Sequence, residues 1–190
     1  QAALLRAQGV CVGDRVGSLG FNHPALLETL FAAHTLGAIF VPLNFRLTGQ
    51  ELTFIINDAG IHTLIVDDAL RPVIEPVRDE LCCRNFYTSE SEAPGCGHLS
   101  TARAEAEPLH SVVSVDQHDV AIIMYTSGTT GLPKGAMLTH GNIVWNNINA
   151  SLAFGGSRDD VILTVAPLFH IGGLNVMTLG SFHMGSTLVL

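Results

Sequence analysis

The sequence has few basic residues, and this scarcity excludes one class of partner. Its 190 residues contain 9 lysines and arginines against 17 aspartates and glutamates, a formal net charge of −8. No cluster of basic residues is present that could neutralise a phosphate backbone, so we expect no nucleic-acid partner. Charged residues make up only 14% of the chain and hydrophobic residues 47%, which is typical of a globular protein with a sizeable core.

Long apolar runs and cysteine motifs are also missing. The apolar stretch at residues 36–41 is stopped by Pro42 and is far shorter than a membrane span, which leaves peripheral contact with a membrane open. The four cysteines have no C-x-x-C spacing, and adjacent Cys82 and Cys83 are poorly placed to bridge each other. These features favour reduced thiols in a cytoplasmic protein. The chain begins without methionine and ends in an apparent strand, so we expect it to be truncated at both ends.

Strand and helix signals alternate along the chain. A polar residue before Pro24 and the capping box Thr48-Gly49-Gln50-Glu51 mark two helix starts. The alternation predicts an α/β fold with parallel-sheet layers flanked by helices. The expected strands are residues 14–19, 38–41, 62–66, 120–125, 161–165 and 186–190, and the expected helices are residues 24–36, 49–59, 140–154 and 172–184.

This alternation is interrupted once, which divides the chain into two blocks. Residues 1–67 are expected to form a first α/β block, and residues 119–190 a second one. Between them, residues 68–118 contain four prolines and a stretch of small polar residues. This composition predicts an irregular surface connection, with one short strand near residues 86–87.

The most informative segment is the glycine-rich run after the strand at residues 120–124. It is Tyr125-Thr126-Ser127-Gly128-Thr129-Thr130-Gly131-Leu132-Pro133-Lys134-Gly135. Glycines let backbone N–H groups turn toward an anion, hydroxyls add donors, and the lysine supplies a mobile positive charge. We therefore expect a phosphate-binding loop that leads from this strand directly into the helix at residues 139–154.

Two common phosphate-binding motifs do not fit this loop. A Walker A motif starting at Gly128 needs glycine where Pro133 stands, and it needs Ser or Thr after Lys134, where Gly135 stands. The Rossmann pattern G-x-G-x-x-G does not occur. An ordinary glycine-rich turn is disfavoured, because such turns rarely combine three threonines, a serine and Pro-Lys-Gly.

At every one of its eleven positions the segment resembles the signature loop of the adenylate-forming superfamily. That superfamily includes acyl-CoA synthetases, aryl-CoA ligases, luciferases and the adenylation domains of peptide synthetases. The segments Leu36-Gly37-Ala38, Val41-Pro42-Leu43-Asn44 and Arg46-Leu47 look like those of bacterial acyl-CoA synthetases, and Gly131 stands where acyl-AMP ligases often carry arginine. The resemblance covers about residues 9–190 and implies part of the large N-terminal domain of a fatty-acid–CoA ligase.

The resemblance implies a reaction in two steps. A carboxylic acid attacks the α-phosphate of ATP, bound with Mg²⁺, to give an acyl-adenylate and pyrophosphate, and the thiol of CoA then displaces AMP. In such a reaction the protein mainly positions the reactants and stabilises the phosphate charge. Small molecules, namely the acid, ATP and CoA, are therefore the expected partners.

The resemblance also implies roles for two loops. Ligands of open parallel sheets bind at the carboxyl ends of strands, so we expect the glycine-rich loop and the loop at residues 166–170 to face one cleft. Lys134 and His170 are the candidate catalytic residues, and Thr126 is the candidate contact for Mg²⁺. The candidate phosphate-binding residues are Thr126, Ser127, Gly128, Thr129, Thr130, Gly131 and Lys134, and those for the acyl and adenylate groups are His170, Gly172, Gly173 and Leu174.

Several alternatives stay open. An aryl-CoA ligase or an acyl-AMP ligase of the same superfamily would share the loop, a phosphotransferase would release ADP instead of pyrophosphate, and a nucleotide-binding module would catalyse nothing. By the resemblance, the acidic Mg²⁺ ligand, the aspartate for the ribose and the small C-terminal domain all follow Leu190. We therefore expect the isolated chain to be inactive, and the sequence leaves acyl length, aromatic preference, acyl acceptor and oligomeric state open.

Overall fold

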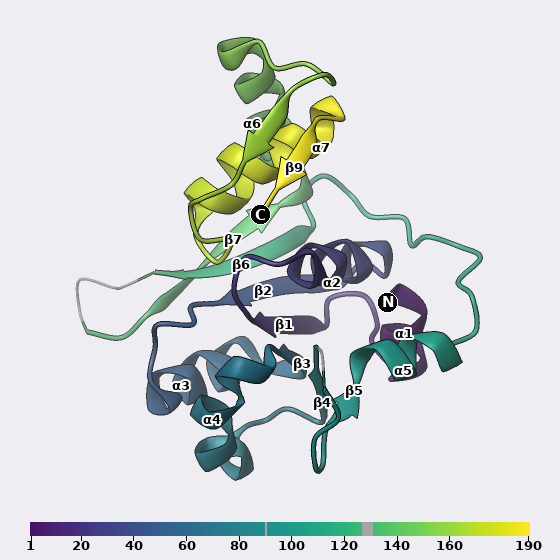
Figure 1. The fold of residues 1–190 in the computed structure, drawn as a ribbon, viewed down its shortest axis with the longest axis vertical. Coiled ribbons are helices and arrows are strands. Elements are labelled where there is room, and N and C mark those ends of the chain that lie inside the picture. Colours follow the sequence, from purple (N-terminus) through teal and green to yellow (C-terminus); the bar gives the residue numbers. More distant parts are fainter. Residues whose placement is uncertain (90, 127–130) are drawn as a thin grey trace.

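The computed structural model describes residues 1–89, 91–126 and 131–190. Its main feature is a seven-stranded sheet in the order β5-β4-β3-β1-β2-β6-β7, which joins strands of both predicted blocks (Figure 1). All neighbouring pairs are parallel except β6 and β7, which are antiparallel. The strands are β1 (Arg15–Leu19), β2 (Ile39–Leu43), β3 (Ile61–Val66), β4 (Asn85–Thr88), β5 (Gly97–His98), β6 (Val120–Thr126) and β7 (Lys134–Thr139).

Helices cover both faces of this sheet in the first block. Successive side chains of a strand point to opposite faces, so Phe40 joins the core under α2 (Pro24–Thr35), whereas Val41 joins the core under α3 (Gly49–Ala59). Both faces are therefore closed by apolar packing, which explains the continuous apolar character of β2 and β3. The shorter helices of this part are α1 (Ala2–Ala7), α4 (Arg71–Ile74), α5 (Leu99–Glu105) and the 3₁₀ helices η1 (Asp68–Leu70) and η2 (Glu75–Glu80).

Capping residues fix the ends of the long helices. The Thr48 hydroxyl accepts from the Glu51 N–H, and the Glu51 carboxylate accepts from the Thr48 N–H, which is the predicted capping box. Gly60 then ends α3 with φ of 64°, a left-handed conformation that glycine adopts without a Cβ penalty. The helix α6 (His140–Phe154) has the same design, with Thr139 and Asn142 at its start and Gly155 at its end.

The glycine-rich loop does not lead directly into α6, and this part of the expectation was wrong. The chain first forms β7, whose Lys134 pairs with Thr126 of β6, and α6 begins only after Thr139. The loop therefore closes an antiparallel hairpin. The strand β7 lies at the sheet edge, where residues 134–137 are all exposed, so it lacks the alternation of buried and polar residues that marks a strand in sequence.

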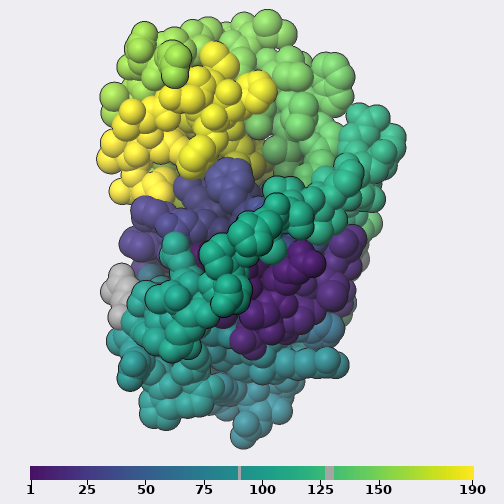
Figure 2. Space-filling model, turned by 90° about the vertical axis from the view of Figure 1, so that its right-hand side faces the viewer, coloured from purple at the N-terminus to yellow at the C-terminus, as the bar shows by residue number. Residues whose placement is uncertain are grey.

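The second block adds a small layer beside the large sheet. Two short parallel strands, β8 (Val161–Leu163) and β9 (Thr187–Val189), pack with α6, the π-helix η3 (Gly172–Leu179) and α7 (Gly180–Met184). This layer forms the green and yellow end of the molecule in Figure 1. Residues 68–118 contain more regular structure than predicted, and the extended segment after α5 crosses the N-terminal residues on the face shown in Figure 2.

Candidate functional site

A cleft of about 580 Å³ lies where the β6–β7 hairpin, the residues after β2, α3 and the loop at residues 166–170 meet. Its floor and sides are mainly apolar, and a smaller group of polar side chains reaches it from the same elements. The apolar lining includes Leu43, Leu47, Phe54, Ile55, Leu132 and Phe169, and the polar lining includes Asn44, Gln50, Glu51, Tyr125, Thr126 and His170.

The described ends of the glycine-rich loop belong to this cleft. Thr126 and Gly131 both line it, and Gly131 has φ of 99°, a conformation that disfavours any residue with a Cβ. Lys134, the only lysine of the chain, is exposed at the start of β7 and lies outside the lining. The remaining predicted phosphate-binding positions, Ser127, Gly128, Thr129 and Thr130, lie outside the described residues.

An asparagine of the first block holds the second loop in place. The Asn22 side-chain amide donates to the Ala166 carbonyl at 2.9 Å, and its Oδ1 accepts from the Leu168 N–H at 2.9 Å. Both bonds join residues more than 140 positions apart. Their partners in the loop, Ala166 and Leu168, lie shortly before His170. Sequence analysis did not single out Asn22 for this role, although its position after the β1 strand, at the carboxyl end of the sheet, was an available signal.

Aromatic side chains brace the same loop from the other side. The rings of Phe45 and Phe169 meet edge to face with their centroids 5.2 Å apart, and the Phe21 ring lies 4.8 Å from that of Phe45. The Arg46 guanidinium lies over both Phe45 and Phe169, at 5.5 Å and 5.9 Å from the ring centroids. His170 is exposed at the cleft, and its Nδ1 accepts from the Gly172 N–H at 3.2 Å, which leaves Nε2 to carry the proton of the neutral ring.

The structure brings His170 and the loop ends together, but not through neighbouring strands. The strand β6 belongs to the large sheet and β8 to the small one. The two loops meet because the two layers pack against each other, with Leu168 and Leu174 buried in the core under α2 and with Asn22 bonded to the loop. Gly173 and Leu174 lie in the first turn of η3. A Cβ on Gly173 would collide with the Pro167 carbonyl, and Leu174 is fully buried in the core. These two residues and Gly172 do not line the cleft.

The α3 side of the cleft was not expected from the sequence. Glu51 and Phe54 line the cleft from the first turns of this helix, yet in the sequence both residues serve only the helix pattern. The Glu51 carboxylate accepts hydrogen bonds from the Thr48 N–H and hydroxyl, each at 2.8 Å, and these bonds lower the pKa of Glu51. This carboxylate is therefore ionised at neutral pH and adds negative charge beside the cleft.

The predicted contact for Mg²⁺, Thr126, lies at the cleft. Thr126 offers one hydroxyl, and among residues 1–89, 91–126 and 131–190 no group of three or more His, Cys, Asp or Glu side chains could hold a metal ion. Magnesium commonly binds through substrate phosphates and water with only one or two protein ligands.

In the same described residues no helix is long and apolar enough to cross a membrane.

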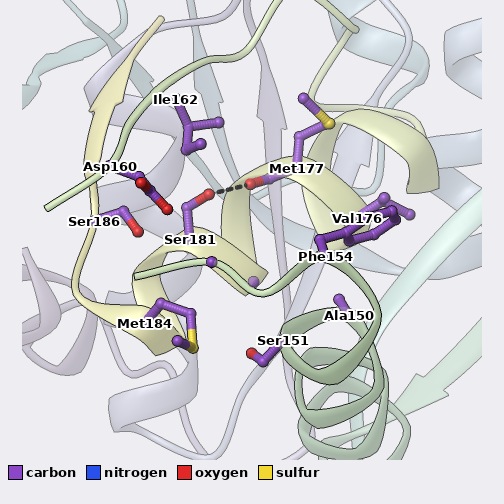
Figure 3. Close-up of a pocket in the computed structure, with 12 residues that line it drawn as sticks. Ala150, Ser151, Phe154, Asp160, Ile162, Val176, Met177, Ser181, Met184 and Ser186 are labelled. Atoms are coloured by element: carbon purple, nitrogen blue, oxygen red, sulfur yellow. Dashed lines mark hydrogen bonds between the residues drawn. The ribbon is translucent and has the colours of Figure 1, made fainter. Parts of the chain in front are cut away.

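A second, more apolar cavity of about 280 Å³ lies within the second block, between α6, η3, α7 and β8. Figure 3 shows Phe154, Val176 and Met184 around it, and a hydrogen bond from the Ser181 hydroxyl to the Met177 carbonyl at 2.6 Å. It shares no lining residue with the cleft at the hairpin. We assign the candidate site to the hairpin cleft, because only that cleft combines the loop ends with His170.

Comparison with known proteins gives a consistent result. A family model described as AMP-binding enzyme matches residues 1–190. The chain is 44% identical over 186 residues to a feruloyl-CoA synthase from an Amycolatopsis species, covering 98% of this chain and 35% of that protein. It is 41% identical over 173 residues to the long-chain-fatty-acid–CoA ligase of Thermus thermophilus, covering 88% and 31%.

Solved structures show the same relationship. A long-chain-fatty-acid-CoA ligase from Archaeoglobus fulgidus superimposes with a TM-score of 0.91 at 31% identity, covering 99% of this chain and 37% of that one. ATP-bound MatB from Rhodopseudomonas palustris superimposes with a TM-score of 0.86 at 29% identity, covering 100% and 37%. The α/β fold is thus that of the N-terminal domain of adenylate-forming CoA ligases, and the chain spans about a third of the length of the relatives it matches.

Proposed function

The chain belongs to the AMP-binding enzyme family, and from this premise we propose that the full-length protein is an AMP-forming acid–CoA ligase. It activates a carboxylic acid with Mg·ATP to an acyl-adenylate and then transfers the acyl group to CoA. The observation that carries this proposal is the shared cleft, in which Thr126 and Gly131 of the glycine-rich loop lie with His170.

The residues of the glycine-rich loop and of the loop at residues 166–170 have proposed roles in the first step. The loop N–H groups and hydroxyls bind the β- and γ-phosphates, and Lys134 neutralises the charge that grows on pyrophosphate as the α–β bond breaks. Thr126 contributes a hydroxyl toward the magnesium ion of the Mg·ATP substrate. His170, held by the loop at residues 166–170, borders the acyl and adenylate groups, with Gly172, Gly173 and Leu174 supporting the backbone behind it.

The acid substrate has an apolar body. Leu43, Phe54 and Phe169 line the cleft and favour an apolar group beside the carboxylate. We propose a fatty acid, which agrees with the resemblance to bacterial fatty-acid–CoA ligases. An aromatic acid is the second candidate, because a relative of 44% identity is named feruloyl-CoA synthase.

A pyrophosphate-release assay on the full-length protein tests the proposal. Hexadecanoate and ferulate are each supplied with Mg·ATP, with and without CoA, and the products AMP and ADP are separated. We expect acid-dependent pyrophosphate and AMP, with hexadecanoate faster than ferulate. A faster reaction with ferulate would establish the second candidate, and ADP with transfer of the γ-phosphate would refute adenylation.

A variant of His170 tests its assignment. Because the ring borders the reacting groups, His170→Ala should slow pyrophosphate release and leave the thermal unfolding midpoint unchanged. Wild-type pyrophosphate release in this variant would show that His170 is an ordinary loop histidine. The isolated 190-residue chain should show no turnover, since it spans only about a third of the length of the relatives it matches.

A further inference from the structure

The hydroxyl of Tyr125 donates a hydrogen bond to Oδ2 of Asp58 at 2.5 Å, across 67 positions of sequence. The bond joins β6, directly before the glycine-rich loop, to the C-terminal turn of α3. Hydrogen bonds from a hydroxyl to an ionised carboxylate are shorter and stronger than those between neutral groups. Burial, this hydrogen bond and the charge of Asp58 raise the pKa of Tyr125, so that the hydroxyl stays protonated and keeps donating.

Tyr125 is built into the base of the hairpin. It pairs with Gly135 of β7 and is followed by Thr126, and both Tyr125 and Thr126 line the cleft. A Cβ on Gly135 would lie 2.8 Å from a methyl carbon of Ile123 and 3.2 Å from the Tyr125 ring. The tyrosine ring therefore packs directly on the glycine backbone, and moving the ring would move both strands of the hairpin.

The partner helix α3 is a rigid anchor. It is fixed by the capping box at Thr48, by Gly60 at its end, and by side chains buried in the core, among them Leu52 and Ile56. Its first turns carry Glu51 and Phe54, which line the same cleft as Tyr125 and Thr126 of the hairpin. The position of the hairpin relative to α3 therefore affects the shape of this cleft.

The position of Asp58 within α3 is locally unfavourable. It is the last residue but one of the helix, where the helix dipole disfavours a negative charge, and the last turn contains no basic residue. The helix gains nothing from this carboxylate by itself. Its identified role is the bond to Tyr125, and because the bond is exposed it adds little to global stability.

We propose that Asp58 is a positioning residue for the phosphate-binding loop, because it holds Tyr125 and with it the base of the β6–β7 hairpin against α3. The consequence for ATP rests on the proposed function, since it requires that the loop binds the nucleotide phosphates. Loss of the bond should let the hairpin move away from α3 and weaken ATP binding, with a smaller effect on the carboxylic acid.

Four variants of the full-length protein test this role. Asp58→Ala and Tyr125→Phe each remove the bond, the double variant removes both partners, and Asp58→Asn restores an acceptor without the charge. A matched control is Asn57→Ala on the same helix, which removes bonds to the Cys82 N–H and the Glu80 carbonyl, away from the hairpin. Steady-state pyrophosphate release gives kcat and the KM values for ATP and acid, and hydrogen exchange reports on residues 120–126 and 131–139.

We expect Asp58→Ala and Tyr125→Phe each to raise the KM for ATP about five- to tenfold, with kcat and the KM for the acid changed less than twofold. The double variant should match the single ones, Asp58→Asn should recover most of the loss, and Asn57→Ala should leave the KM for ATP unchanged. Exchange in the hairpin should be faster in both single variants and unchanged in the control.

An unchanged KM for ATP, or a double variant whose effect is the product of the single effects, would overturn the positioning role. Unchanged hydrogen exchange in the hairpin of both single variants would show that the bond does not anchor the hairpin. If the wild-type protein releases no pyrophosphate while exchange responds as expected, the ligase proposal fails and the anchoring of the hairpin by Asp58 is supported.

Discussion

Leu52 and Leu152 are both leucines of long helices, yet Leu52 is fully buried whereas Leu152 is 80% exposed. The same contrast separates the two blocks as wholes. Of the 18 exposed large hydrophobic side chains in the described part of the chain, 14 lie at or after residue 132, so the apolar surface belongs almost entirely to the second block. The first block has helices on both sheet faces, while much of α6 and the small sheet faces solvent.

This difference between the blocks affects how the two walls of the candidate site are held in place. The core of the first block is closed within the chain, so the positions of α3 and of the residues after β2 follow from packing. The loop at residues 166–170 is held by Leu168, which is buried in the core under α2, by the contact of Phe169 with Phe45, and by the hydrogen bonds of Asn22. The candidate site therefore joins a wall fixed by a closed core to a wall that also depends on the hydrogen bonds of one asparagine.

The largest change in the free energy of unfolding is expected when Leu52, rather than Leu152, is replaced by alanine. Leu52→Ala removes side-chain packing from a closed core and should lower the free energy of unfolding by about 2–5 kcal/mol. Leu152→Ala removes an exposed side chain and should change it by less than about 0.5 kcal/mol. Thermal unfolding of the two variants of the full-length protein measures both values. Similar losses for both leucines would show that Leu152 is buried in that protein and that the contrast belongs only to the isolated chain.

The next largest loss of stability is expected at the contact between Asn22 and the loop at residues 166–170. Asn22→Ala leaves the Ala166 carbonyl and the Leu168 N–H without their partner, and should cost about 1–3 kcal/mol of stability. Because the loop carries His170, pyrophosphate release should also fall, and hydrogen exchange at Leu168 should accelerate. Asn22→Asp is the matched control, since its carboxylate still accepts from Leu168 but cannot donate to Ala166. Wild-type exchange at Leu168 in Asn22→Ala would contradict the assigned role.

The smallest effect concerns the pH dependence of stability at another contact, between α2 and β6. His34 of α2 bonds the Ala121 carbonyl of β6 through Nε2 at 3.0 Å, and its ring centroid lies 5.0 Å from that of His140. Burial lowers the pKa of His34 from 6.5 to about 4, with a smaller contribution from His140, whose own pKa is also lowered. The unfolded chain therefore binds a proton that the folded chain rejects, and stability falls as the pH drops from about 6.5 toward 4.

Between pH 7 and pH 5.5 this linkage should remove about 1 kcal/mol of stability. Chemical unfolding at the two pH values measures it, and His34→Gln, which keeps a donor for the Ala121 carbonyl, should reduce the pH dependence. Identical pH dependence in the variant would assign the effect to other groups, such as His140, whose pKa burial also lowers.

The sequence predicted those parts whose signals are local. The capping box at Thr48, the glycine that ends α3 and the apolar runs of β1 to β3 specify elements without reference to the rest of the fold. The hairpin strand β7 was missed because it is an exposed edge strand, and the apolar residues of α6, such as Leu152, left open what would cover them. A pattern of apolar residues shows that a face can be buried, not which partner buries it.

The candidate site divides in the same way. The glycine-rich loop and His170 were found because their residue types form a recognisable motif, and the described loop ends and His170 do share a cleft. Asn22 and Asp58 were missed because their hydrogen-bond partners lie far away in sequence. Glu51 and Phe54 were missed because their local roles in α3 do not show that they line the cleft.

The central claim is that the hairpin loop acts on the phosphates of ATP, and Lys134→Ala tests it most directly. The two half-reactions are measured separately in the full-length protein, as pyrophosphate release and as thioester formation from supplied acyl-adenylate. Arg158→Ala, which removes an exposed cation that does not line the cleft, is the control. Adenylate formation should lose about 2–4 kcal/mol of transition-state stabilisation, with little change in thioester formation, because pyrophosphate has already left. Equal losses in both half-reactions would contradict the account.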